Sequence, residues 1–221
     1  MLIKEPIMNT IKRLISAILI IALLTVSLSS CKKSLKKYDE DTSTEEKDVY
    51  YVAMLVEDHG VIILKLDAKS APITVANFIK LVREDFYDGL TFHRVISGFM
   101  IQGGDPLGTG KGGSKETIIG EFSANGHNNP IKHERGVISM ARSGQSYNSA
   151  SSQFFICNAT NKSVSSLDGN YAAFGYVIKG LDVVDSITAE TAKFGDSNGT
   201  IGVKARQAVI TEMKVIIYNE K

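Results

Sequence analysis

The feature that most constrains this chain is the stretch from Phe92 to Gly104, FHRVISGFMIQGG. Two short runs of β-branched, aromatic and apolar residues flank a serine–glycine turn, which is typical of two strands joined by a tight connection. Alternation along strands lets Arg94 share one face with a group of apolar and amide side chains. That group consists of Phe99, Met100 and Gln102. The stretch therefore predicts a shallow apolar surface with two polar groups.

A second stretch, Ser151 to Cys157 (SSQFFIC), has the same character. Gln153 and Phe155 are two residues apart and so lie on one face of a strand. Two strands that each offer an amide and large apolar groups, with one arginine between them, suit an extended peptide. They suit a small charged metabolite less well.

Composition excludes several other classes of function. The chain has 221 residues, of which 43% are hydrophobic and 22% charged, as in an ordinary globular domain with appendages. Its net charge of +1 creates no strong field for nucleic acid, so we expect no nucleic-acid partner. None of its four histidines pairs with a cysteine or another histidine at zinc-ligand spacing, so no metal site is expected.

The amino terminus has the pattern of a targeting sequence. Lys12-Arg13 precede an apolar run from Leu14 to Leu28, which is shorter than the ~20 residues of a membrane-spanning helix. The following Leu28-Ser29-Ser30-Cys31 resembles the bacterial lipobox, so we expect a lipoprotein signal peptide over 1–30 and lipidation of Cys31. The alternative is an ordinary secretory signal with a chance cysteine. A lipidated Cys31 would leave only Cys157, in an apolar strand pattern, as a buried thiol.

The next segment is polar and charged from Lys32 to Asp48. Because it has almost no apolar residues to bury, we expect residues 31–48 to form the lipidated cysteine and a flexible charged tether. Folded structure is expected from Val49 onward, which makes 49–221 the single domain of the chain.

Periodicity within 49–221 predicts many short strands and two helices. Tyr51–Val56 and Val61–Leu66 have the pattern of a hairpin, and Pro72 is suited to the first turn of a helix. This pattern favours a mainly β fold, a closed barrel capped by helices. The further strands are expected at Gly136–Ala141, Gln153–Cys157, Phe174–Ile178 and Ala208–Tyr218, and the second helix at Leu181–Ile187.

Two sequence motifs do not have the context that their chemistry requires. Gly108 to Gly113 matches G-x-G-x-x-G, but a β-like run follows it where a dinucleotide site needs a helix. Ser143 and Ser146 could be paired with His133 as nucleophile and base, but neither serine lies in a G-x-S-x-G elbow. The glycine-rich segment is therefore interpreted as a surface loop.

Four segments together resemble the cyclophilin-type peptidyl-prolyl isomerases. They are Phe92–Pro106 (FHRVISGFMIQGGDP), Gly136–Arg142 (GVISMAR), Ser151–Cys157 (SSQFFIC) and Leu167–Gly175 (LDGNYAAFG), and Glu121–Gly136 is similar to the bacterial branch of the family. The resemblance runs from about Val49 to Tyr218. It implies a closed eight-stranded antiparallel β-barrel capped by two α-helices, and an activity that needs no cofactor.

The resemblance also implies roles for particular residues. Arg94 and Gln102 fall on catalytic positions, and Tyr171 and Ser166 stand where another family member has histidine and tryptophan. The remaining residues are expected to bind the substrate: Phe99, Met100, Gly110, Ala141, Arg142, Ser143, Gln153, Phe155 and Leu167, with Tyr171 closing the pocket.

The function expected from these features is catalysis of X-Pro bond rotation in proteins of the bacterial cell envelope, which assists their folding. The enzyme would be a lipid-anchored monomer whose partners are extended, proline-containing polypeptides. The alternative is a module that binds proline-containing segments and whose catalysis is incidental. The presence of Arg94 favours the enzyme, because binding alone does not require a cation there.

Overall fold

The computed structural model describes residues 35–219 of the chain. A 3-10 turn spans Leu35–Lys37, and a separate compact unit begins at Tyr38. The expected signal peptide (1–30) and the lipidation site Cys31 lie outside the described residues. Within 35–219, no helix is long and apolar enough to cross a membrane.

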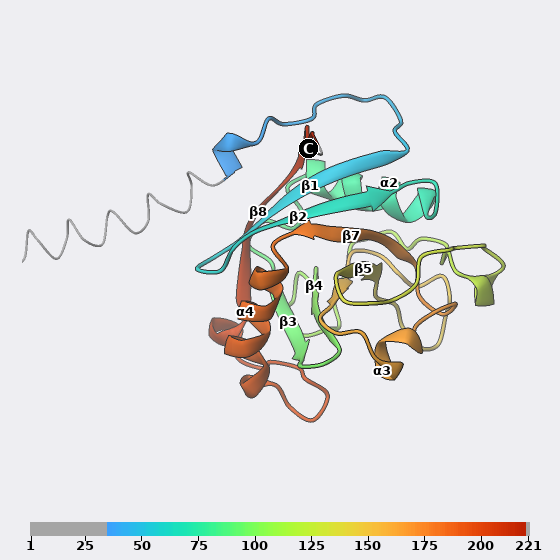
Figure 1. Cartoon of the computed structure of the whole chain (residues 1–221). Coiled ribbons are helices and arrows are strands. Elements are labelled where there is room, and N and C mark those ends of the chain that lie inside the picture. Colours follow the sequence, from blue (N-terminus) through green and yellow to red (C-terminus); the bar gives the residue numbers. More distant parts are fainter. Residues whose placement is uncertain (1–34, 220–221) are drawn as a thin grey trace, which may run out of the picture. The chain divides into compact units, whose positions relative to one another are not determined.

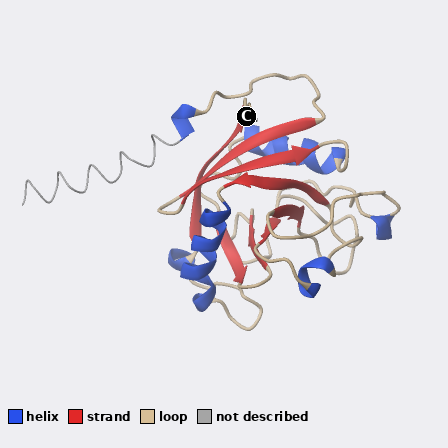
Figure 2. Cartoon of the chain, in the orientation of Figure 1, coloured by secondary structure: helices blue, strands red, loops and turns tan. Residues whose placement is uncertain are grey.

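Eight antiparallel strands close into a barrel, as predicted (Figures 1 and 2). Their spatial order is β1, β2, β7, β5, β6, β4, β3, β8, and β8 returns to pair with β1. Closure pairs the strands on both sides, so the backbone hydrogen bonds that an open sheet would leave at its edges are made. The strands are β1 (Val49–Val56), β2 (Gly60–Asp67), β3 (Thr91–Ile96), β4 (Met100–Gly103), β5 (Val137–Met140), β6 (Phe154–Cys157), β7 (Ala173–Lys179) and β8 (Ala208–Ile216).

Two helices contribute to the same hydrophobic core as the strands. Helix α2 (Pro72–Arg83) and helix α4 (Leu181–Thr191) lie on different sides of the strands in Figure 1. Their apolar faces join one continuous buried cluster with the barrel interior, which is what the helical spacing of these residues predicted. A third, four-residue helix, α3 (Lys162–Ser165), is too short to show a period in the sequence, and the Asn161 side chain caps its first turn.

Aromatic packing in the core fixes the start of the glycine-rich loop. The Phe78 ring centroid lies 5.0 Å from that of Tyr87 and 5.6 Å from that of Phe154. The buried Tyr87 hydroxyl donates to the Ser152 carbonyl (3.1 Å), and the Ser152 hydroxyl donates to the Gly104 carbonyl (2.7 Å). Gly104 has φ +83°, and a Cβ there would lie 2.5 Å from the Ser152 carbonyl oxygen. Only glycine fits this close approach.

The segment from Asp39 to Asp48, which we call the strap, lies against the barrel. The Asp41 N–H donates to the Val215 carbonyl (2.9 Å), so the strap continues the pairing of β8 beyond its contact with β3. The Arg83 guanidinium at the end of α2 donates to the Ser43 carbonyl (2.6 Å). One backbone–backbone hydrogen bond and one bond from an arginine side chain to a backbone carbonyl therefore hold the strap at two places.

This arrangement differs from the flexible tether expected for 31–48. The expectation considered only side-chain burial, whereas the strap is held mainly by backbone hydrogen bonds and by an ion pair between Lys47 and Asp41. The compact unit accordingly begins at Tyr38 and not at Val49.

A buried carboxylate from a distant loop caps helix α2. The residue before the helix, Ala71, has no side chain that can accept a hydrogen bond. Glu121, which is 1% exposed, accepts instead from the N–H groups of Ile73 (3.0 Å) and Thr74 (2.8 Å). A negative charge at this position satisfies two otherwise unpaired donors and complements the helix dipole.

Replacing Glu121 by alanine should destabilise the domain by about 2 kcal/mol, because both N–H groups lose their buried acceptor. The Glu121→Gln variant retains one acceptor oxygen and should lose less. Urea unfolding followed by circular dichroism measures both changes. Unfolding midpoints equal to that of the unmodified protein would contradict this role of the carboxylate.

Candidate active site

A cavity of 310 Å³ opens on the barrel surface beside β3 and β4. The fold brings together residues from the stretch Phe92–Gly104, the end of β5, strand β6 and the segment between α3 and β7. Every residue that lines it was predicted to belong to the site. The lining consists of Arg94, Phe99, Met100, Gln102, Ala141, Arg142, Phe155, Leu167 and Tyr171.

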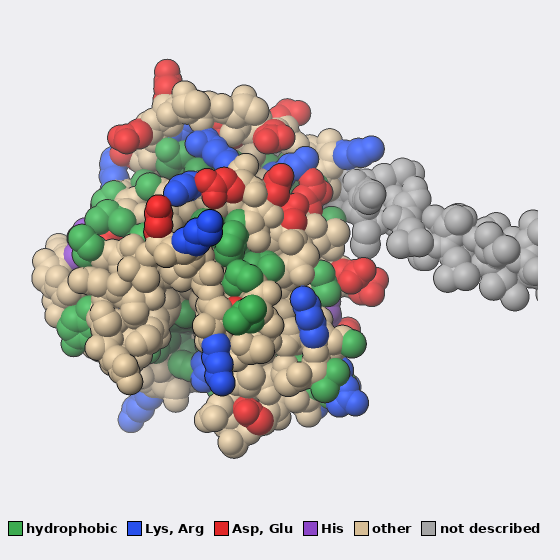
Figure 3. All heavy atoms as spheres, turned by 180° about the vertical axis from the view of Figure 1, so that it is seen from behind, with side chains coloured by type: hydrophobic (Ala, Val, Ile, Leu, Met, Phe, Trp, Pro, Cys, Tyr) green, Lys and Arg blue, Asp and Glu red, His purple; other side chains and the backbone are tan. Residues whose placement is uncertain are grey.

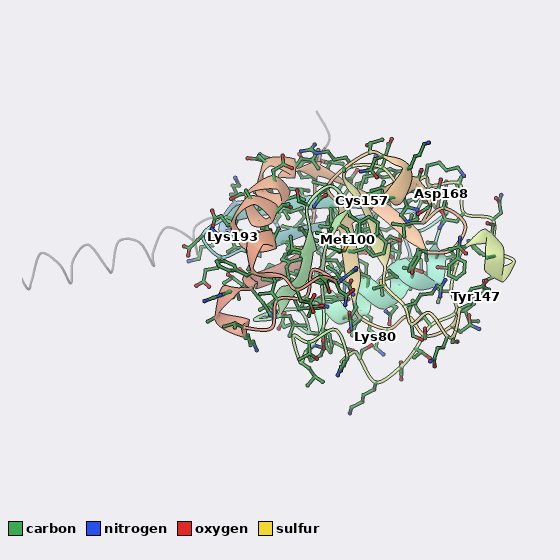
Figure 4. The ribbon with its side chains drawn as sticks, turned by 90° about the horizontal axis from the view of Figure 1, so that it is seen from below. Lys80, Met100, Tyr147, Cys157, Asp168 and Lys193 are labelled. Carbon is green, nitrogen blue, oxygen red and sulfur yellow. The ribbon has the colours of Figure 1, made fainter. Side chains whose placement is uncertain are left out.

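The floor of this cavity is apolar and almost fully buried. Met100, Phe155 and Leu167 are 1%, 4% and 9% exposed and form one cluster with Cys157. Met100 and Cys157 are cross-strand partners in β4 and β6, and Figure 4 shows them close together in the middle of the molecule. Burial raises the pKa of the Cys157 thiol to about 12, so the thiol stays protonated and acts as a small apolar group, as predicted.

A fixed cation lies at the edge of the apolar floor. The Arg94 guanidinium donates from Nη1 to Gln102 Oε1 (3.1 Å) and from Nε to the Asn198 carbonyl (2.7 Å). Burial lowers the pKa of Arg94, while Tyr171 and Asp196 raise it, and a guanidinium in this range remains charged at neutral pH. The positive charge is therefore permanent and held in one orientation.

The hydrogen bonds continue from this cation through two amides to the glycine-rich loop. Gln102 Nε2 donates to Gln153 Oε1 (2.8 Å), and Gln153 Nε2 donates to the carbonyls of Gly110 (3.2 Å) and Gly112 (2.7 Å). Because an arginine can only donate, it requires Gln102 to present its oxygen, and this in turn orients Gln153. We call this chain the amide relay.

A second cavity of 340 Å³ adjoins the first and shares Gln102, Ala141 and Arg142 with it. The other predicted contact residues line this cavity: Gly110, Ser143 and Gln153. All of the predicted substrate-binding residues thus lie along one continuous surface made of two cavities.

A buried histidine supports the floor of the first cavity from behind. The His133 ring stacks on Phe155 with centroids 6.0 Å apart and planes inclined by 18°. His133 Nδ1 lies 2.9 Å from Asp168 Oδ1, and its Nε2 lies 3.0 Å from Ser139 Oγ. The histidine is 3% exposed and the serine is fully buried, so this Ser-His-Asp group lines neither cavity and has no access for a substrate. It holds the aromatic floor in place.

Two contacts of this site and one lining residue were not predicted. The Asn198 carbonyl that binds Arg94 is a backbone group and leaves no side-chain signal in the sequence. The pairing of His133 with Asp168 joins residues 35 positions apart, which no local spacing reveals. Lys111, which lines the second cavity, was treated only as part of a loop.

The fold and the site together define a closed β-barrel with an apolar slot on its surface beside a fixed guanidinium. A sequence profile described as "Cyclophilin type peptidyl-prolyl cis-trans isomerase/CLD" matches residues 51–215. The chain belongs to this family of peptidyl-prolyl cis-trans isomerases.

Relatives from two bacteria carry the same activity in their names. The "Peptidyl-prolyl cis-trans isomerase" of Helicobacter pylori (strain J99) is 42% identical over 157 residues, which cover 70% of this chain and 90% of the relative. The "Peptidyl-prolyl cis-trans isomerase B" of Bacillus subtilis is 46% identical over 134 residues, covering 61% and 87%. A crystal structure of a Cryptosporidium parvum cyclophilin-type isomerase superposes with a TM-score of 0.66 at 28% identity, covering 77% of this chain and 99% of that one.

The buried His133 should make the protein less stable in mild acid. Burial lowers its pKa below the usual value near 6.5, so the unfolded chain binds the proton more readily than the folded protein does. The contribution of neutral His133 to the free energy of unfolding is therefore complete above about pH 6.5. It is lost as the pH falls from there through the lowered pKa of the folded protein.

Urea unfolding at pH 7.5 and pH 5.5 measures this loss. The His133→Gln variant should lose less stability between these values than the unmodified protein, although burial also lowers the pKa of His93 and leaves that contribution in place. Equal losses in the two proteins would show that His133 does not carry the effect.

Proposed function

We propose that this isomerase rotates X-Pro bonds in proteins of the bacterial cell envelope and so assists their folding, with Arg94 and Gln102 as its catalytic residues. We also propose that a lipid on Cys31 holds it at a membrane. The observation that carries the catalytic part is the Arg94 guanidinium, fixed by two hydrogen bonds at the edge of the apolar slot.

The chemistry to be accelerated is rotation about an amide bond. Its barrier of ~18–20 kcal/mol reflects the resonance that must be lost as the bond twists. In the twisted state the proline nitrogen recovers its lone pair and can accept a hydrogen bond. A donor aimed at that nitrogen binds the transition state more strongly than either ground state, which is the condition for a higher rate.

Arg94 is suited to be that donor. It is a permanent cation with several N–H groups. The hydrogen bonds from Nε to the Asn198 carbonyl and from Nη1 to Gln102 hold it in place. A ~10⁵-fold acceleration corresponds to only about 7 kcal/mol, which one charged hydrogen bond and good positioning can supply. No covalent step occurs, so the reaction requires neither a nucleophile nor an external proton.

The other site residues would bind the two sides of the rotating bond at separate places, so that one side can turn relative to the other. The proline ring would occupy the slot formed by Phe99, Met100, Phe155 and Leu167, and the residue before it would lie against Gln102 and the backbone near Arg142. A structure of the similar Cryptosporidium parvum isomerase was obtained in the presence of the dipeptide Ala-Pro, and that chain matches with a TM-score of 0.64. This supports proline-containing peptides as the substrates here.

The proposed location rests on the sequence before the barrel. Leu28-Ser29-Ser30-Cys31 follows a 15-residue apolar run, which is the arrangement of a bacterial lipoprotein signal. One amino-terminal lipid group with two or three acyl chains gives stable membrane attachment, whereas a single chain does not.

Substitution of Arg94 by alanine should lower kcat/KM for X-Pro peptides by ~10²-fold or more while the fold stays intact. The Arg94→Lys variant should recover little, because a lysine lacks the planar arrangement of donors. A protease-coupled peptide assay measures the rates, and thermal unfolding checks the fold. Near-normal activity of Arg94→Ala would refute this mechanism.

Substitution of Cys31 by serine should prevent lipidation. The variant should leave the membrane fraction or accumulate as an uncleaved precursor, and labelled palmitate should enter only the unmodified protein. Equal labelling of both proteins would rule out Cys31 as the attachment site.

A further inference from the structure

The charged side chains that line the second cavity are all basic. Lys111 and Arg142 both line it, and none of the described residues that line it is Asp or Glu. On the face shown in Figure 3, by contrast, acidic and basic side chains are interspersed. The remaining lining is made of small and neutral polar groups: Gln102, Gly110, Gly112, Gly113, Ser114, Ala141, Ser143, Ser149, Ser151 and Gln153.

The backbone that carries Lys111 is fixed on both sides. Gln153 at the end of the amide relay binds the carbonyls of Gly110 and Gly112, the two neighbours of Lys111. The carboxylate of Asp105 accepts hydrogen bonds from the N–H groups of Thr109 (2.9 Å) and Gly110 (2.6 Å). Asp105 is 1% exposed and is occupied by these donors, so it holds the loop without lining the cavity.

Aromatic rings hold Arg142, the second basic residue of the cavity lining. Its guanidinium carbon lies 5.3 Å from the ring centroid of Phe122, 5.0 Å from Tyr147 and 4.8 Å from Tyr171. Nε also donates to the Asn170 carbonyl (2.9 Å). Nη1 donates to the Ser143 carbonyl (2.9 Å). These partners orient the cation and carry no negative charge, so the guanidinium keeps its full charge and the Nη2 donors to bind an anion.

From these contacts we infer that the second cavity binds an acidic side chain of the substrate, located on the amino-terminal side of the proline. A peptide with its proline in the apolar slot must pass the wall formed by Gln102, Ala141 and Arg142, which the two cavities share. Its second or third residue before the proline then reaches a space with several hydroxyl donors and two cations, the oriented Arg142 guanidinium and the exposed Lys111 ammonium. The inference concerns the substrate preference of the isomerase and does not depend on the lipid anchor.

Peptides that differ only in glutamate or glutamine test the preference. One pair carries the change at the second residue before an Ala-Pro bond and another at the third, and kcat/KM of the full-length protein is measured at low salt. Because each cation is partly exposed, the glutamate peptide of at least one pair should react about 5- to 10-fold faster than its glutamine partner. The difference should shrink in 0.5 M salt, which screens exposed charges.

A charge reversal in the cavity provides the matched control. Lys111→Glu should bring the glutamate-to-glutamine ratio below one, whereas Lys204→Glu, an exposed lysine away from both cavities, should preserve it. If the protein turns over the glutamine peptides but the glutamate-to-glutamine ratio of kcat/KM lies within twofold of one at both positions, the inference is overturned. The isomerase activity is then unaffected. An unchanged ratio in Lys111→Glu would also overturn it. Failure of every peptide to react would overturn both the preference and the activity.

Discussion

The hydrogen bond from Arg94 to Gln102 determines much of the site. Since a guanidinium has no acceptor, the bond fixes which end of the Gln102 amide faces the arginine, and Gln153 must follow the same direction. The relay ends on two loop carbonyls, so the cation also determines where the glycine-rich loop lies. The same few groups thus set the geometry of the proposed proline slot and of the neighbouring cavity, so a change at one end of the relay should alter the geometry at the other end.

Local patterns in the sequence predicted a closed, mainly β barrel, and the resemblance to the cyclophilin-type isomerases supplied most of the residues expected in the groove. Arg94 and Gln102 face each other across β3 and β4 because strand alternation and the short turn leave little other choice. The missed features depend on contacts between distant segments or on backbone atoms. Glu121 caps a helix 47 positions earlier, and much of the hold on the strap comes from main-chain groups, whose presence is independent of side-chain type. Hydrophobic periodicity carries no information on either contact.

The residues behind the proposed proline slot change from apolar to polar with distance from the cavity. Phe155 faces the cavity, His133 stacks behind it, and Asp168 and Ser139 bind the two ring nitrogens of that histidine. A neutral imidazole has one donor and one acceptor, so it can serve a carboxylate on one side and a hydroxyl on the other without carrying charge into the interior. This arrangement gives a rigid floor to a slot that must hold a small ring while the bond beside it turns.

The strap also limits how far the barrel could lie from a lipid attached at Cys31. If a lipid is attached at Cys31, the chain from there to Tyr38 can extend at most roughly 25 Å, because the following residues are bound to the barrel. A barrel attached by so short a segment would stay within a thin layer of solvent along the bilayer and would not reach the full depth of the compartment. Chains that emerge from or fold beside the membrane would meet it by lateral diffusion in two dimensions, and distant ones would seldom encounter it.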